Sequence, residues 1–282
     1  MEPARLSCEG TRRGALRALA AALAASLAAA GRRAAAAGQA EVGFIRNIPP
    51  FADEFARDGI FVDLMRMALQ ADGRVMVPRF FPNLQLEFDP LARFPNLSMY
   101  VGAQAGPPTR YPAVKLYEFH DVAVTKARLG LRIDSFRDLV GKRVLAYGGA
   151  HQLLGPAFNR FHRHLLADSP AYAETQNRLA QNQAFWQEQV DVILIDRDIF
   201  HYHRKVLAAR KDSDTPGIDY AEKVTFHEIF REPVSVHAVG RSAGDMQRLE
   251  HQLKTMKSTG AFQQIVDRYT QMTPPRTPSP LR

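Results

Sequence analysis

Residues 122–158 constrain the fold of this chain more than any other segment. Residues 122–124 are apolar and predict a strand, and Asp134 and Ser135 can cap a short helix that follows. Residues 143–147 predict a second strand. The segment therefore alternates strands with short helices, which is the pattern of an α/β protein.

The glycine pair after the second strand is suited to an anion. Gly148 and Gly149 stand before a predicted helix that begins near His151 and carries an apolar face of Leu153, Leu154, Phe158 and Phe161. Glycine lets backbone N–H groups approach a ligand closely, and a helix N-terminus favours negative charge. An ordinary strand-to-helix turn is the alternative that the residues leave open.

The order of these elements resembles the opening of the second lobe in bacterial extracellular solute-binding proteins of family 3, the amino-acid-binding type. Residues 49–51 (PPF) resemble the opening of that family, and residues 190–196 (VDVILID) resemble its strand that ends in an acid. Residues 249–269 resemble its C-terminal signature. The resemblance covers residues 41–272 and is weakest over 72–108, where prolines interrupt the pattern.

This resemblance implies an α/β chain with the two-lobed type II periplasmic-binding-protein fold and two hinge crossings, near residues 118–123 and 228–234. Within the second lobe, residues 171–189 have a helical composition. The implied parts are a leader, a first lobe in two pieces, a second lobe and a disordered tail, at residues 1–40, 41–121 with 228–272, 122–227 and 273–282.

The N-terminus has the composition of a signal peptide. Arg12, Arg13 and Arg17 precede an Ala- and Leu-rich run at residues 18–30, which is shorter than the roughly 20 apolar residues of a membrane span. Cleavage after Ala37 or after Ala40 fits the small residues that follow the run. The chain is therefore expected to be exported and cleaved.

The route of export is indicated by the arginine pair. Arg12-Arg13 resembles the twin-arginine signal, although Ala15 replaces the aromatic residue usual there. General secretion is the alternative. Both routes predict a periplasmic location.

Charge and cysteine content exclude some classes of function. Residues 1–40 hold six arginines and two acids, a net of +4, so they carry half of the formal net charge of +8. The remaining charge gives no nucleic-acid footprint. Cys8 is the only cysteine and lies in the predicted leader, so no disulfide is expected in the mature chain.

The resemblance implies a clamp in which an arginine binds a ligand carboxylate and an acid binds its ammonium group. Arg110 matches the family's arginine by its spacing to Tyr117, and a guanidinium can bind a carboxylate with two hydrogen bonds. Pro107 replaces the family's usual threonine. Asp196 ends a buried strand and matches the ammonium-binding acid; capping of the next helix is the other interpretation.

The remaining candidates would complete a ligand site. Backbone N–H groups of Gly149, Ala150 and His151 are expected to bind the carboxylate, and Phe51 and Tyr117 are expected to wall the pocket. Simple packing is the alternative for both aromatic residues.

Histidine pairs invite a metal interpretation, which the spacing does not favour. His162 and His164, like His201 and His203, stand two residues apart, so on a helix they point to different faces. We expect solvated histidines, no metal and no cofactor, and no nucleophile elbow or P-loop is present in the sequence.

The leading hypothesis is a non-enzymatic, monomeric periplasmic solute-binding protein. It would close on a small polar solute, an amino acid or related carboxylate, and deliver it to a membrane ABC permease. The alternatives are a periplasmic enzyme on the same scaffold, similar to cyclohexadienyl dehydratase, and an accessory or sensory binding module.

Overall fold

The computed structural model describes residues 38–82, 90–103, 110–210 and 217–271. Most of the predicted leader and the whole predicted tail lie outside these residues. Within the described part, no helix is both long enough and apolar enough to cross a bilayer.

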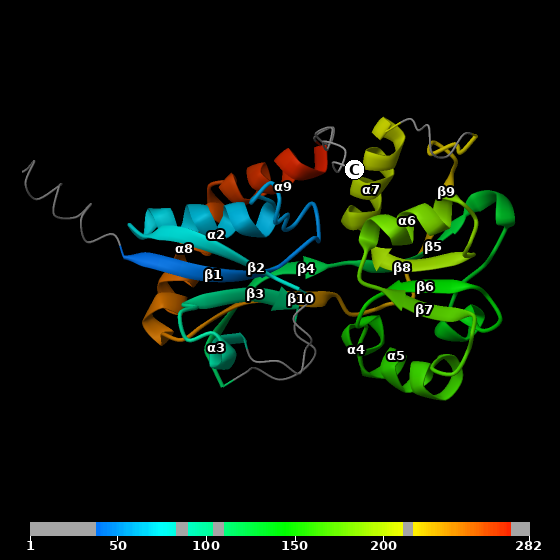
Figure 1. Ribbon diagram of the computed structural model, residues 1–282, viewed down its shortest axis with the longest axis horizontal. Coiled ribbons are helices and arrows are strands. Elements are labelled where there is room, and N and C mark those ends of the chain that lie inside the picture. The colour runs from blue at the N-terminus through cyan, green and yellow to red at the C-terminus, as the bar shows by residue number, and fades with distance from the viewer. Residues whose placement is uncertain (1–37, 83–89, 104–109, 211–216, 272–282) are drawn as a thin grey trace, which may run out of the picture.

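The described residues form two five-stranded mixed sheets, each in its own lobe (Figure 1). The strand order is β2-β1-β3-β10-β4 in lobe I and β7-β6-β8-β5-β9 in lobe II. Lobe I contains β1 (Gln39–Ile45), β2 (Val75–Phe81), β3 (Met99–Ala103), β4 (Ala113–Phe119) and β10 (Val234–Gly240). Lobe II contains β5 (Asp121–Lys126), β6 (Val144–Tyr147), β7 (Tyr172–Thr175), β8 (Val192–Asp196) and β9 (Val224–His227).

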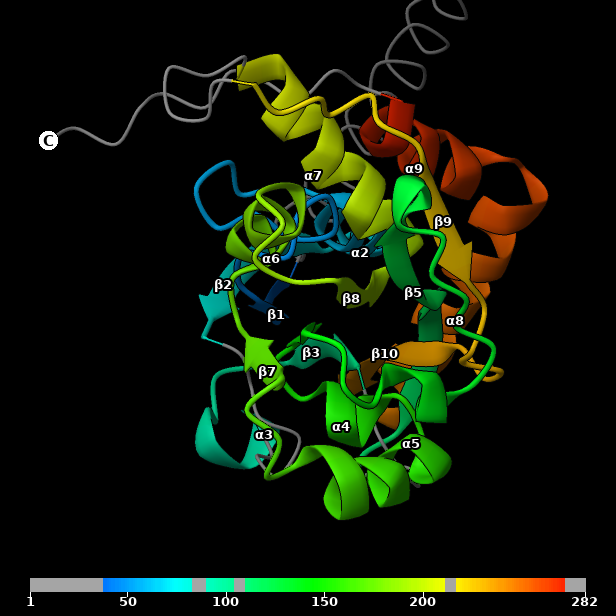
Figure 2. The same cartoon turned by 90° about the vertical axis from the view of Figure 1, so that its right-hand side faces the viewer.

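Helices cover both faces of each sheet. In lobe I, α2 (Ile60–Ala71), α8 (Ala243–Ser258) and α9 (Ala261–Gln271) contact one another, and the short α3 (Pro90–Arg93) packs by β3 over a separate small core. In lobe II, α6 (Arg178–Trp186) and α7 (Arg197–Arg210) lie on one side of the sheet, and α4 (Ala150–Leu153) and α5 (Pro156–Phe161) on the other (Figure 2).

The chain crosses between the lobes twice. His120 alone separates β4 from β5, and residues 228–233 lead from β9 to β10. The crossings lie at the two places predicted from the sequence, and the two-lobed α/β fold is confirmed. Side chains also join the lobes: Lys205 Nζ donates to the Thr270 carbonyl at 2.6 Å, and the Tyr117 hydroxyl donates to Asp198 at 3.2 Å.

Burial explains why these segments form these elements. The buried residues of α2 recur at helical spacing, from Phe61 through Leu64 and Met65 to Ala68. In β5 and β8 every residue is buried, because helices cover both faces of the sheet at its centre.

Two predictions about local structure were wrong in lobe II. Residues 172–175, inside the predicted helix 171–189, form β7 and pair in parallel with β6, so tertiary pairing overrides a weak helical composition. The helix predicted from His151 is broken, because Gly155 has a φ of 93° and Pro156 restarts the chain as α5.

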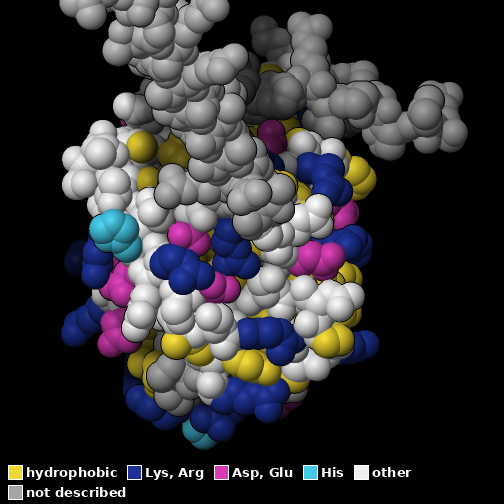
Figure 3. All heavy atoms as spheres, turned by 90° about the vertical axis from the view of Figure 1, so that its left-hand side faces the viewer, with side chains coloured by type: hydrophobic (Ala, Val, Ile, Leu, Met, Phe, Trp, Pro, Cys, Tyr) yellow, Lys and Arg dark blue, Asp and Glu magenta, His cyan; other side chains and the backbone are white. Residues whose placement is uncertain are grey.

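The end of lobe I that faces away from lobe II carries both signs of charge. Basic and acidic side chains lie interspersed on that face (Figure 3). Ion pairs within lobe I include Arg79 with Glu41 and Arg248 with Asp72. Neither sign of charge dominates this face.

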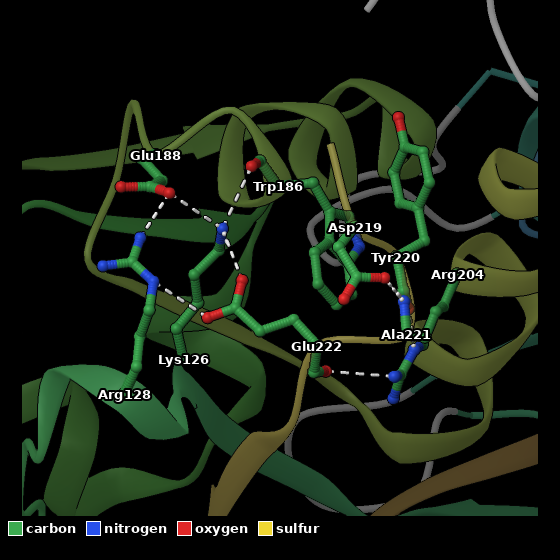
Figure 4. Close-up of polar contacts among 9 residues, drawn as sticks. All are labelled: Lys126, Arg128, Trp186, Glu188, Arg204, Asp219, Tyr220, Ala221 and Glu222. Carbon is green, nitrogen blue, oxygen red and sulfur yellow. Dashed lines mark hydrogen bonds and ion pairs between the residues drawn. The ribbon is translucent and has the colours of Figure 1, made fainter. Parts of the chain in front are cut away.

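A buried lysine holds together the end of lobe II (Figure 4). Lys126 Nζ, 5% exposed as a side chain, lies 3.1 Å from both Glu188 and Glu222 and donates to the Trp186 carbonyl at 3.2 Å. Arg128 pairs with the same two acids. Because these groups come from β5, from the loop after α6 and from the segment before β9, the network ties three parts of the lobe together.

We expect Lys126→Met to lower the free energy of unfolding by about 1.5–3 kcal/mol. The substitution removes the hydrogen bonds of a charged group and takes one cationic partner away from the half-buried Glu222. Urea unfolding followed by the fluorescence of Trp186, the only tryptophan, measures this change. The matched control is Lys115→Met, because Lys115 pairs with Glu118 on the surface, where such pairs contribute about 1 kcal/mol or less. Equal losses in both variants would contradict the account.

Candidate functional site

A cavity of about 710 Å³ lies between the two lobes. Its lining comes from strand ends and loops of lobe I, including Ile45, Asn47 and Phe119, and from the β5, β6, β8 and α6 ends of lobe II. Ligands of open α/β sheets bind outside the carboxyl ends of the strands, and a cavity of this volume is of the size that holds a small molecule.

Two buried acids lie at the lobe II end of this cavity. Asp121 begins β5 and Asp196 ends β8, and the two residues are direct partners across the antiparallel pair. They are 5% and 4% exposed, and both line the cavity. Like charges directly opposite each other in a sheet repel, so this pair is costly unless a proton or a cation lies between them.

The two carboxyl groups have different partners. Asp196 accepts hydrogen bonds from the backbone N–H groups of His120, Asp198 and Ile199, at 2.9–3.0 Å, and so caps α7. Asp121 accepts one, from the Tyr147 hydroxyl at 3.2 Å. Burial raises the pKa of Asp121 to about 7, and burial together with the charge of Asp121 raises the pKa of Asp196 well above its ordinary value.

Arg178 is a cation of the cavity lining whose charge acts on Asp121. It is the first residue of α6, and its guanidinium lies 4.8 Å from the centroid of the Tyr147 ring. Its Nη1 donates to the Thr175 carbonyl at 3.1 Å, whereas its buried Nε has no hydrogen-bond partner among the described residues.

His203 on α7 also lines the cavity. It is 3% exposed, and neither ring nitrogen has a hydrogen-bond partner among the described residues. Burial lowers its pKa to about 3, so the ring is neutral near pH 7 and can donate one hydrogen bond and accept another. The expectation of a solvated histidine is wrong at this position.

The turn at Gly148 and Gly149 already binds an anion, the side-chain carboxylate of Glu174. The Glu174 carboxylate accepts hydrogen bonds from the backbone N–H groups of Gly149 at 2.8 Å and His151 at 3.0 Å. It also contacts His151 Nδ1 at 2.9 Å and accepts from the Tyr172 hydroxyl at 2.8 Å. Ala150, between these two amides, is fully buried. A ligand carboxylate would have to displace Glu174 to bind here.

The other predicted residues lie around the cavity. Arg110 does not line it; this exposed side chain lies over the Tyr111 ring and donates to the Tyr111 hydroxyl at 3.0 Å. Phe51 and Tyr117 pack edge to face in an aromatic cluster with Phe61 and Phe119. Of that cluster, Phe61 and Phe119 contribute to the lining.

Sequence reasoning missed Asp121, Arg178 and His203. Asp121 precedes an apolar strand at a predicted crossing, and an acid at that position could have been recognised as a candidate site residue. Arg178 could not be found, since β7, the strand that leads to it, was assigned to a helix. His203 reads in sequence as one of several helix histidines.

One group of side chains in the described part of the chain could approach a metal ion. The candidate ligand atoms of His151, His162 and Glu174 lie within 4.8 Å of one another. The two rings are stacked at 24°, and Glu174 is already engaged by two amides and a hydroxyl. Glu174 would have to give up these bonds to bind an ion, so we assign no metal role to this group.

No protein-family model and no curated protein matches this chain. Solved structures do match it. The GluR0 ligand-binding core from Nostoc punctiforme, solved with L-glutamate, is similar over 82% of this chain and 98% of its own length, at 16% identity and a TM-score of 0.56.

Two other matched structures belong to different kinds of protein. The substrate-binding protein of an ABC uptake transporter from Streptococcus pneumoniae, solved with histidine, matches 83% of this chain and 93% of its own, at 15% identity and a TM-score of 0.57. A histidine kinase sensor domain similar to periplasmic binding proteins matches 82% and 95%, at 13% identity and a TM-score of 0.59.

The chain has the type II periplasmic-binding-protein fold. The resemblance to amino-acid-binding proteins of family 3 that the sequence predicted is confirmed at the level of fold. In such a two-lobed fold the space between the lobes is the natural place for a ligand, and in this chain the buried acids, Arg178 and His203 meet there.

We expect Asp121→Asn to raise the free energy of unfolding at pH 8 and to leave it nearly unchanged at pH 4. The folded chain holds the Asp121 proton up to a pKa of about 7, whereas the unfolded chain releases it near 3.8. The contribution of this group to stability is therefore full below pH 3.8 and is lost as the pH rises through 7. The expected gain at pH 8 is about 2–4 kcal/mol.

Urea unfolding of wild type and variant across this pH range measures the effect. The control is Asp138→Asn, because the pKa of Asp138 is lowered, chiefly by hydrogen bonds from the Asp134 backbone N–H and the Ser135 side chain. Asp138→Asn should therefore lower the free energy of unfolding at pH 8, the opposite of the change expected for Asp121→Asn. A wild-type pH profile in Asp121→Asn would show that this carboxyl is not held protonated.

Proposed function

We propose that this protein is a periplasmic solute-binding protein that captures an amino acid or a related small carboxylate for an ABC importer. One observation carries the proposal: the interlobe cavity brings two buried acids, directly opposite each other, near a half-buried arginine whose Nε is buried and unpaired among the described residues. An amino-acid zwitterion offers an ammonium group and a carboxylate close together, so it can satisfy both sets of groups in one cavity.

The ammonium group is assigned to the acid pair. Asp196 is held rigidly by three backbone N–H groups, so its carboxylate is pre-oriented toward the cavity. Asp121 lies directly opposite and would ionise when a cation arrives, because a nearby positive charge lowers the pKa of an acid. The role of Asp196 predicted from the sequence and its role as a helix cap are therefore compatible.

Capture would involve the two lobes predicted from the sequence, residues 41–121 with 228–272 and residues 122–227. Two short crossings suit a rotation of one lobe against the other, and such a motion encloses a ligand. Phe61 and Phe119 of lobe I would supply apolar contacts from the opposite wall. Phe51 and Tyr117 would support them from behind, and the permease would recognise the closed form.

A thermal-shift screen of the mature protein against the twenty amino acids and their decarboxylated amines tests this function. An amino acid present at about 100 times its Kd should stabilise the folded state by roughly 2.7 kcal/mol. Stabilisation by one or a few amino acids, and not by the matched amines, is the expected result. No stabilisation by any amino acid would contradict the proposal.

Asp196→Asn tests the assignment of the ammonium group. Asparagine retains an oxygen that can cap α7 but loses the charge, so binding of the amino acid found in the screen should weaken by about 1.5–3 kcal/mol, or roughly ten- to a hundredfold. Calorimetric titration measures it. Glu174→Gln, at the occupied glycine turn outside the cavity lining, is the comparison and should retain affinity.

An enzyme on this scaffold is the second candidate. Asp121 favours it, since a buried carboxyl group with a pKa near 7 is suited to general acid or base catalysis. Chemical conversion of a bound solute during prolonged incubation, detected by mass spectrometry and lost in Asp121→Asn, would replace the transport proposal.

The predicted leader leads to a further expectation about the mature N-terminus. β1 begins at Gln39, and Ala40 is fully buried within it, so cleavage after Ala40 would remove the start of a core strand. We expect cleavage after Ala37, which leaves β1 whole. Mass spectrometry of the protein recovered from the periplasm distinguishes the two sites, and a mature chain that begins at Glu41 would contradict the expectation.

The route of export is tested with the same preparation. Replacing Arg12 and Arg13 with lysine should leave precursor in the cytoplasm if the twin-arginine route is used. Unchanged accumulation in the periplasm would indicate general secretion.

A further inference from the structure

Arg178 is placed as a ligand-binding arginine would be. Asn177 caps α6 by accepting a hydrogen bond from the Ala180 N–H at 3.0 Å, and Arg178 follows as the first helical residue, at the positive end of the helix dipole. The Tyr147 ring supports one face of the guanidinium, 4.8 Å from its carbon. Both residues line the cavity, so the fork is held in position before a ligand arrives.

The guanidinium is only partly paired by the described residues. Its Nη1 donates to the Thr175 carbonyl, and its buried Nε donates to no described group. Burial lowers its pKa to about 10, which still leaves the group charged at neutral pH. The charges of Asp121, Glu174 and Asp196 act on this half-buried group, but no described carboxylate is bonded to it, so an incoming anion can still pair directly with the guanidinium.

His203 supplies a second unsatisfied group in the same cavity. Both ring nitrogens are buried and lack hydrogen-bond partners among the described residues. A neutral imidazole can donate one hydrogen bond to a carboxylate oxygen. Buried polar groups in folded proteins are nearly always paired, so two such side chains lining one cavity point to a ligand that pairs with them.

The other place for an anion in lobe II is taken. Glu174 occupies the amides of Gly149 and His151, and displacing it would leave a half-buried carboxylate without those hydrogen bonds. Arg110 of lobe I does not line the cavity. Arg178 is therefore the cation in the described lining with a buried donor still to be satisfied.

We propose that Arg178 binds the α-carboxylate of the captured amino acid from lobe II, with His203 as an additional hydrogen-bond donor. The proposal rests on the amino-acid-binding function proposed above and identifies the group that selects for it. The ammonium group then lies between Asp121 and Asp196. Lobe II holds both polar groups on the α-carbon of the ligand, and lobe I covers the ligand's side chain. Affinity is then set by lobe II before closure.

Three ligand pairs test the assignment, each differing only by the α-carboxylate: L-glutamate with 4-aminobutyrate, L-histidine with histamine, and L-arginine with agmatine. Calorimetry on wild type is expected to show tight binding of at least one of these amino acids and weak binding of its amine. Arg178→Met should weaken the binding of that amino acid ten- to a hundredfold and leave the binding of its amine nearly unchanged. The preference for the ligand that carries a carboxylate then disappears. His203→Phe should reduce the same preference by a smaller factor.

The matched control is Arg197→Met. Arg197 is likewise the first residue of a lobe II helix and stacks on an aromatic ring, Phe226 at 4.4 Å, but it does not line the cavity. The Arg197→Met variant should keep the wild-type preference for the amino acid over its amine. Arg178→Gln serves in place of Arg178→Met if the latter does not unfold with the wild-type cooperative transition in Trp186 fluorescence.

The outcomes separate the two proposals. An amino acid that binds wild type and both Arg178 variants with the same preference over its amine overturns the role of Arg178 and leaves the proposed function intact. A preference lost in Arg110→Ala instead would move the carboxylate to lobe I and also overturn it. If none of the twenty amino acids binds wild type, the proposed function fails and this assignment fails with it.

Discussion

Two carboxyl groups buried opposite each other, Asp121 and Asp196, set the physical problem that the rest of this structure answers. A sheet can bury a pair of like charges only if it supplies protons, hydrogen-bond donors or cations. Here the turn into α7 supplies three backbone N–H groups, Tyr147 supplies a hydroxyl, and α6 brings Arg178 nearby. These groups orient the acids, and the proposed ligand would add a cation to the pair.

The cost of the pair is tolerable because of where it lies. Asp121 begins β5 one residue after the first crossing, and Asp196 ends β8, so both lie at the edge of the lobe II core where it meets the cavity. The interior of the same strands, residues 122–125 and 192–195, is buried and holds the lobe together. Apolar packing therefore lies in the middle of each strand, and the buried acid lies at its end.

Contacts outside the crossings limit how the lobes can move. Lys205 on α7 reaches Thr270 on α9, and Tyr117 on β4 reaches Asp198 on α7. Both bonds join α7 of lobe II to lobe I. A rotation that encloses a ligand can preserve them, and we expect the α7 side to act as the pivot.

The sequence was sufficient for the fold, because order and spacing carry that information. Helix α2 carries apolar residues at helical spacing, and strand β8 is an apolar run that ends in an acid, so both are readable from the sequence. Strand β7 is not, because its identity comes from pairing with β6, a contact between segments about 28 residues apart in sequence. The candidate site follows the same division: Asp196 was predicted from its strand, whereas Arg178 depends on the misassigned β7.

The anion-binding turn shows a different limit. Its glycines and helix start are where the pattern places them, and its amides do bind a carboxylate, but that carboxylate is Glu174, a residue of β7. Local sequence can indicate that a turn favours an anion, and it cannot tell whether the anion is a ligand or a side chain from another strand. Long-range pairing decides that question.

The most direct measurement is a crystal structure of the mature protein with the amino acid that binds it most tightly. The account predicts a carboxylate oxygen within hydrogen-bond distance of Arg178 Nε, an ammonium group against Asp121 and Asp196, and Glu174 still bonded to the amides of Gly149 and His151. A carboxylate bound to Arg110, or one that has displaced Glu174 from the glycine turn, would contradict it.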